Sequence, residues 1–118
     1  MKYISTRDNT KEYNFEQVFI KGLADDGGLY VPKTLKKFSA EELIKLKNLN
    51  YNALSAEIIS LFSEDFISKE ELSSLINKSY STFREKEVVK ISNVGEIKLL
   101  ELFHGPTLAF KDVAMQLI

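Results

Sequence analysis

The segment His104–Asp112 carries the residues with the clearest chemical potential in this sequence. It reads His-Gly-Pro-Thr-Leu-Ala-Phe-Lys-Asp and follows directly on a run of aliphatic residues that is typical of a strand. Gly105 and Pro106 predict a tight turn, because glycine has wide conformational freedom and proline fixes φ. Thr107 is then expected to cap a helix with its hydroxyl, and Lys111 is expected in the first turn of that helix.

Lys111 in such a position could act as an amine nucleophile. The positive end of a helix dipole disfavours an ammonium group, and the apolar neighbours Leu108, Ala109 and Phe110 disfavour it further. Both effects favour the free amine that Schiff-base chemistry requires. The residues alone favour a plainer alternative, in which Lys111 is a solvent-exposed helix lysine neutralised by Asp112.

Two other polar residues of this region have weaker claims to a chemical role. His104 could touch a substrate, but a hydrogen bond that fixes the corner between strand and turn is the favoured interpretation. Asp112 most simply favours the amino end of the predicted helix electrostatically. Arg7, far upstream, could contact an anion, although a surface salt bridge is the favoured reading.

Three helices are predicted upstream from capping boxes, in which a polar cap residue is followed three positions later by glutamate or glutamine. The pairs are Asn14 with Gln17, Ser39 with Glu42, and Ser68 with Glu71. Gly22 fits the left-handed position that ends the first helix. Apolar stripes at helical spacing predict a core between helices; they comprise Leu54, Ile58, Leu61 and Phe62, then Leu72, Leu75, Ile76, Tyr80 and Phe83.

Short strands are predicted around and after these helices. Residues 28–31 form one extended element before Pro32, and Val88, Val89 and Ile91 begin another. A turn at 93–96 leads to a strand over 97–103. Gly27 and Gly28 lack the strand-before, helix-after context of a phosphate-binding loop, so a tight turn is the better interpretation.

Composition excludes several functional classes. The formal net charge of −1 offers no basic field for nucleic acid or an anionic membrane. The chain has no cysteine and one histidine, which argues against thiol chemistry and a metal site. No apolar stretch approaches the roughly 20 residues of a membrane span, and the start lacks a secretory signal, so a cytoplasmic location is expected. The 118 residues have room for one core.

Three stretches together resemble the threonine synthase family. The string Glu101–Asp112 is similar to the cofactor-lysine motif of that family, Tyr3–Arg7 resembles its start, and Gly22–Pro32 resembles its glycine-rich stretch. The resemblance covers essentially the whole chain in order and spacing. Asp8 stands where many members carry glycine, which puts nothing catalytic in doubt.

The resemblance implies a pyridoxal-phosphate enzyme that converts O-phospho-L-homoserine and water to L-threonine and phosphate. Lys111 would be both the catalytic and the cofactor-binding residue, holding pyridoxal phosphate as a Schiff base and moving protons on the substrate. The implied partner is this small-molecule substrate, with no metal. The oligomeric state stays open.

The expected fold class is α+β: a mainly helical domain over 1–86, and over 87–118 the first strand–helix unit of a pyridoxal-phosphate-binding α/β fold. The family's phosphate-binding loop lies further along, and residues 111–118 end on apolar side chains without a helix stop signal. We therefore expect a truncated chain that is inactive alone.

Two alternatives stay open at this point. One is another pyridoxal-phosphate enzyme of the same broad class, either a dehydratase or a phospholyase-like relative of threonine synthase. The glycine-rich stretch argues against the dehydratase, and nothing in the sequence excludes the phospholyase. The other is a non-enzymatic helical interaction module.

Overall fold

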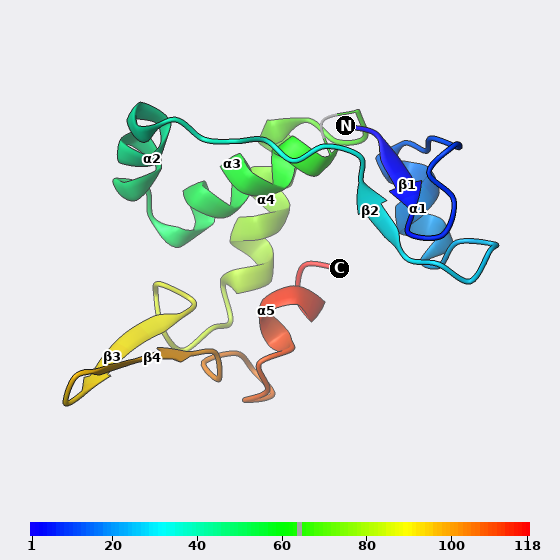
Figure 1. Cartoon of the computed structure of the whole chain (residues 1–118). Coiled ribbons are helices and arrows are strands. Elements are labelled where there is room, and N and C mark those ends of the chain that lie inside the picture. Colours follow the sequence, from blue (N-terminus) through cyan, green and yellow to red (C-terminus); the bar gives the residue numbers. More distant parts are fainter. Residues whose placement is uncertain (64) are drawn as a thin grey trace.

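The computed structural model describes residues 1–63 and 65–118, and it shows a group of helices with short strands on either side of it in the chain (Figure 1). This mixed architecture confirms the expected combination of helices and a few short strands. In chain order the elements are β1 (Tyr3–Ser5), α1 (Phe15–Lys21), β2 (Tyr30–Pro32), α2 (Ala40–Lys47), α3 (Tyr51–Ser63), α4 (Lys69–Tyr80), β3 (Lys90–Val94), β4 (Ile97–Glu101) and α5 (Asp112–Met115).

All three predicted helix starts are confirmed, because each cap residue makes both bonds of its capping box. Asn14, Ser39 and Ser68 each accept a hydrogen bond from the backbone N–H three residues later, and the side chain there accepts from the cap's own N–H. Gly22 ends α1 with φ of +74°, as its residue type predicts.

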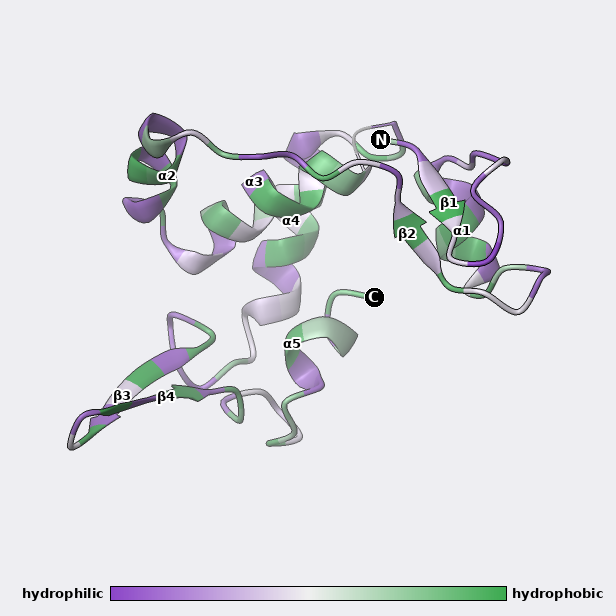
Figure 2. Cartoon of the chain, in the orientation of Figure 1, coloured by the Kyte–Doolittle hydropathy of each residue, from purple (hydrophilic) through white to green (hydrophobic). Residues whose placement is uncertain are grey.

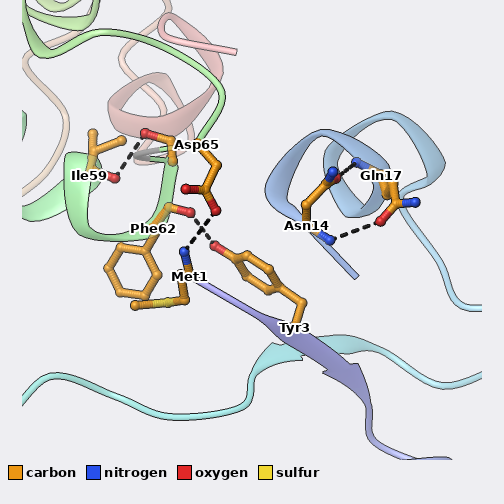
Figure 3. Close-up of polar contacts among 8 residues, drawn as sticks. Met1, Tyr3, Asn14, Gln17, Ile59, Phe62 and Asp65 are labelled. Atoms are coloured by element: carbon orange, nitrogen blue, oxygen red, sulfur yellow. Dashed lines mark hydrogen bonds and ion pairs between the residues drawn. The ribbon is translucent and has the colours of Figure 1, made fainter. Parts of the chain in front are cut away.

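The amino-terminal strand ties the first helix to the helical body. β1 pairs antiparallel with β2, with Tyr3 opposite Pro32, which confirms the extended element predicted there. The Tyr3 hydroxyl donates to the Phe62 carbonyl at 2.8 Å, and the Met1 amino group lies 3.3 Å from an Asp65 carboxylate oxygen (Figure 3). Two polar contacts therefore fasten the chain start to the carboxyl end of α3.

The core lies between α3 and α4, with one contribution from the following loop. Its buried members are Ala56, Leu72, Ile76, Tyr80 and Val88, and the Ile76 side chain has no solvent exposure at all. Three of the residues predicted in the second apolar stripe are therefore core. A further member of that stripe, Leu75 in α4, is 47% exposed and therefore does not belong to the core.

Val88 departs from the sequence prediction of a strand. Its φ is +60° and its side chain is 1% exposed, so the chain turns sharply there to place the side chain in the core. The strand β3 begins only at Lys90. Phe83, predicted as the end of the helical stripe, follows α4 and packs edge-to-face on Tyr80 with ring centroids 5.1 Å apart.

The strands β3 and β4 form the predicted antiparallel hairpin, joined by a turn of two residues. Val94 pairs with Ile97, which leaves only Gly95 and Glu96 in the turn, and Gly95 takes the positive φ of +61° that such turns require. The second strand ends at Glu101, two residues before the predicted end at Phe103. The hairpin extends from the helices, with hydrophobic positions along it (Figure 2).

Candidate functional site

Residues 105–112, here called the lysine turn, join the hairpin to α5. At their base lies Asp112, whose side chain is almost completely buried. One Asp112 carboxylate oxygen accepts the Thr107 backbone N–H at 2.8 Å, and the other accepts the Thr107 hydroxyl at 2.8 Å. A single side chain therefore closes the turn through two hydrogen bonds to one residue.

Two sequence predictions about this turn are wrong. Thr107 does not cap a helix, because its hydroxyl donates to Asp112 and α5 begins only at Asp112. Lys111 consequently occupies the N-cap position, without a side-chain capping bond, and does not lie in the first turn. Asp112 acts on Thr107 and not simply on the helix end, because its carboxylate points back along the chain.

The electrostatics of Asp112 follow from its contacts. Burial raises the pKa of this carboxyl, but the hydrogen bonds from the Thr107 hydroxyl and N–H, with smaller contributions from Gln116 and the Leu108 N–H, outweigh burial and lower the pKa overall. The Asp112 carboxylate is thus ionised and occupied by its own turn. The expected neutralisation of Lys111 by Asp112 is absent among the ion pairs of the described residues.

The Lys111 side chain is exposed, and so are its apolar neighbours. Leu108 is 51% exposed and Phe110 is 65% exposed, so the apolar surroundings expected from the sequence do not enclose the amine. An accessible primary amine is the group with which an aldehyde cofactor reacts. Lys111 is therefore a residue that could hold an aldehyde cofactor.

The backbone of the lysine turn contains a non-glycine residue in the left-handed region. Leu108 has φ of +63°, and its N–H donates to the Gly105 carbonyl at 3.2 Å. A bulky residue in this conformation costs on the order of 1–2 kcal/mol and persists only where surrounding contacts impose it. The bonds between Thr107 and Asp112 are such contacts.

His104 fixes the corner between β4 and the lysine turn, as the sequence predicts. Its Nε2 lies 2.8 Å from a Glu101 carboxylate oxygen, and its carbonyl accepts the Arg84 backbone N–H at 2.9 Å. Hydrogen bonds from the Ser92 and His104 side chains keep the pKa of Glu101 below its usual value. Both bonds of His104 point away from a substrate role and toward a structural one.

A contact that sequence reasoning missed links α5 to the core. The Tyr80 hydroxyl donates to the Val113 carbonyl at 2.7 Å, across 33 positions of sequence, and burial strongly raises the Tyr80 pKa. Tyr80 was predicted only as an apolar stripe member. Its type, an aromatic ring with a polar tip that needs a partner when buried, is the signal that could have indicated such a bond.

The glycine-rich stretch forms a structural turn, as predicted, and is remote in sequence from the lysine turn. Gly27 has φ of +76°, and Asp26 accepts both the Gly28 N–H and the Ser5 hydroxyl at 2.8 Å. The Arg7 guanidinium donates to the Asp26 backbone carbonyl at 3.0 Å, and the favoured salt bridge of Arg7 is not among the ion pairs of the described residues. Sequence reasoning missed the Ser5–Asp26 bond.

The described residues contain neither a cluster of metal-ligating side chains nor a helix that could span a membrane. In residues 1–63 and 65–118, no group of three or more metal-ligating side chains comes together. No helix in the same part of the chain is long and apolar enough to cross a membrane.

The fold and the lysine turn define an α+β chain that presents an accessible amine at the start of a short helix. A sequence profile described as threonine synthase N terminus matches residues 2–80. Threonine synthase from Pseudomonas aeruginosa is 41% identical over 100% of this chain and 25% of its own length. Threonine synthase-like 2 from Pongo abelii is 39% identical over 98% of this chain and 24% of its own length.

The structural comparison agrees with the sequence comparison. A crystal structure of PLP-bound threonine synthase from Brucella melitensis has a TM-score of 0.93 at 39% identity, covering 99% of this chain and 25% of that chain. The chain belongs to the threonine synthase family, and it spans about a quarter of the length of these relatives.

Proposed function

We propose that this chain is the amino-terminal part of a pyridoxal-phosphate-dependent threonine synthase and that Lys111 holds the cofactor. In this proposal residues 1–86 form a helical domain, and residues 87–118 begin the catalytic domain with the hairpin and the lysine turn. The observation that carries the proposal is an exposed amine on a backbone turn whose neighbouring carboxylate is engaged elsewhere.

The residues of this chain supply the attachment point and its support. Lys111 would bind the cofactor aldehyde through its amine, while Asp112 and Thr107 hold the turn. Pyridoxal phosphate, when bound, supplies an electron sink that stabilises negative charge on substrate carbons beside it. The Lys111 Nζ, as a free amine, would accept and return protons on the substrate as a general base and acid.

The proposed reaction converts O-phospho-L-homoserine and water to L-threonine and phosphate. The starts of α1, α2 and α4 are occupied by their own capping side chains, and Asp26 accepts the Gly28 N–H in the Gly27–Gly28 turn. The proposal therefore assigns the cofactor phosphate to a part of the enzyme outside residues 1–118. We therefore expect residues 1–118 alone to release no phosphate from this substrate.

The test uses the full-length protein loaded with pyridoxal phosphate, reduced with borohydride and mapped by peptide mass spectrometry. We expect the label on Lys111, and we expect Lys111→Ala to abolish both label and phosphate release. Lys98→Ala, which removes an exposed lysine from β4, is the control and should keep both. Label spread over surface lysines, with no phosphate release, would contradict the proposal.

A second candidate within the same class is a phospholyase-like relative of threonine synthase, because the residues of this chain do not fix which substrate is bound. A relative named threonine synthase-like 2 also matches this chain, at 39% identity. Product analysis separates the two. Phosphate and threonine released in equal amounts support the synthase, whereas phosphate released without threonine indicates the phospholyase.

A further inference from the structure

We propose that Asp112 is a positioning residue for Lys111 and acts through Thr107. The inference rests on the proposed role of Lys111 as the cofactor lysine. It adds that hydrogen bonds on either side of Lys111 restrain the position of its backbone. The two hydrogen bonds between Thr107 and Asp112 close a ring that contains residues 107–112, and Lys111 lies within this ring.

The geometry of this ring is specific to a carboxylate. Asp112 uses one oxygen for the Thr107 N–H and the other for the Thr107 hydroxyl, both at 2.8 Å. Hydrogen bonds to an ionised acceptor are about twice as strong as neutral ones. An asparagine at 112 would replace one of these two oxygens with an NH2 donor, so one of the two Thr107 donors would face another donor.

The Asp112 side chain packs closely against Gly105. A Cβ added to Gly105 would lie 2.4 Å from the Asp112 Cβ and from one of its carboxylate oxygens. The Asp112 side chain therefore occupies the space that a side chain at 105 would need. The Asp112 side chain is only 3% exposed. Backbone and side chain of residue 112 are therefore both held.

Lys111 inherits this restraint through its backbone. Its carbonyl accepts the N–H groups of Ala114 at 3.0 Å and Met115 at 2.8 Å, and its carbonyl carbon is bonded to the fixed Asp112. The Lys111 Cα is thus restrained by these backbone bonds, and the amine at the end of the four-carbon side chain is exposed. A fixed attachment point reduces the entropy lost when the amine is held, which favours cofactor binding and proton transfer.

The experiment compares Thr107→Val with Thr107→Ser in the full-length holoenzyme. Valine keeps the volume and the backbone N–H but loses the hydroxyl, whereas serine keeps the hydroxyl. We expect Thr107→Val to weaken pyridoxal phosphate binding roughly tenfold, which corresponds to about one charge-assisted hydrogen bond. We also expect a lower kcat at unchanged KM and a shifted pH midpoint of the bound cofactor's visible absorbance.

Serine at 107 should restore all three quantities to near the wild-type values, which a merely structural role would not require. Asp112→Asn should weaken binding in the same direction as Thr107→Val. Thr34→Val, which alters an exposed threonine in the loop after β2, is the matched control and should change none of these quantities. Thr107 is itself exposed, so the valine variant is expected to fold.

The possible failures are separable. If borohydride labels no Lys111 in the wild-type protein, the proposed function fails. If Lys111 is labelled but Thr107→Val and Asp112→Asn bind the cofactor with wild-type affinity and spectrum, the positioning role is overturned while the proposed function stands. Equal impairment by valine and serine at 107 would also overturn it, because the hydroxyl would then not be the cause.

Discussion

At the scale of single residues, the lysine turn depends on which atoms are missing as much as on which are present. Gly105 provides space because it has no Cβ, and Asp112 fills that space with its carboxylate. The residue types of this segment announced a turn and a reactive lysine. They did not predict that Asp112 would accept hydrogen bonds from Thr107, because that pairing depends on the turn of the backbone at Leu108, where φ is +63°.

Gly105→Ala is expected to destabilise the protein. The new methyl group would meet the Asp112 side chain at 2.4 Å and force it out of its buried place, a form of overpacking that costs about 1–3 kcal/mol. Thermal unfolding measures the effect. Gly95→Ala adds a methyl group where nothing lies within 4 Å, so its loss of stability reports the positive φ of +61° alone and separates that effect from crowding. Equal stability of wild-type protein and Gly105→Ala would contradict the packing described for Asp112.

Acid pH is expected to weaken the lysine turn in a defined direction. Hydrogen bonds lower the Asp112 pKa in the folded protein from the ordinary 3.8, so the unfolded state binds the proton more readily. The stabilisation is therefore fully present above pH 3.8 and is lost as pH falls through the lower folded pKa. In acid unfolding curves, Asp112→Asn should lose less stability than wild type over this range. Parallel curves would contradict the assignment.

At the scale of elements, the start of each helix is determined by residues close together in sequence, whereas its part in the core depends on the tertiary structure. All three capping boxes were readable from four residues each, because cap and partner lie within one turn. Which helix forms the core was not readable in this way. α4 buries Leu72, Ile76 and Tyr80, whereas α2 buries no residue, although both have the same kind of cap.

Ser68→Ala and Ser39→Ala should therefore differ in effect. Removing the cap of α4 is expected to lower the global unfolding free energy by about 1 kcal/mol, because α4 belongs to the core. Removing the cap of α2 is expected to loosen only that helix. Chemical denaturation measures the first effect, and amide hydrogen exchange over 40–47 measures the second. Equal global losses would show that α2 unfolds together with the core.

Tyr80→Phe tests the link between the core and α5. The variant keeps the ring packing on Tyr51 and Phe83 but leaves the Val113 carbonyl without its donor, at a cost of about 0.5–1.5 kcal/mol. Faster hydrogen exchange over 112–118 than over α3 is the expected signature. Uniformly faster exchange would mean that the hydroxyl supports the core as a whole and not α5.

At the scale of the whole molecule, the chain is more open than its length requires. Its radius of gyration is 16.4 Å, whereas a compact domain of this length has about 13.5 Å. The hairpin and the β1–β2 unit extend from the helices (Figure 1), and large apolar side chains such as Ile91, Ile97 and Phe103 are exposed on or beside the hairpin. A single small core therefore carries most of the stability.

Ile76→Ala is expected to be strongly destabilising for this reason. The side chain is fully buried at the centre of the only cluster assembled from α3, α4 and Val88 in the described residues, and its loss costs about 2–5 kcal/mol. Leu43→Ala, on the exposed side of α2, should change the unfolding free energy little. Denaturant midpoints measure both, and a small loss at Ile76 would contradict the assignment of the core.

The sequence by itself determined the helix starts, the glycine-ended helix, the hairpin and the resemblance that leads to Lys111. Each rests on neighbouring residues whose chemistry acts within one turn or one motif. Only the tertiary structure decided that Tyr80 reaches Val113 and that Asp112 turns back to Thr107. It also decided that Val88 leaves the strand for the core. Those outcomes depend on where distant segments meet and on backbone angles that burial, not local preference, imposes.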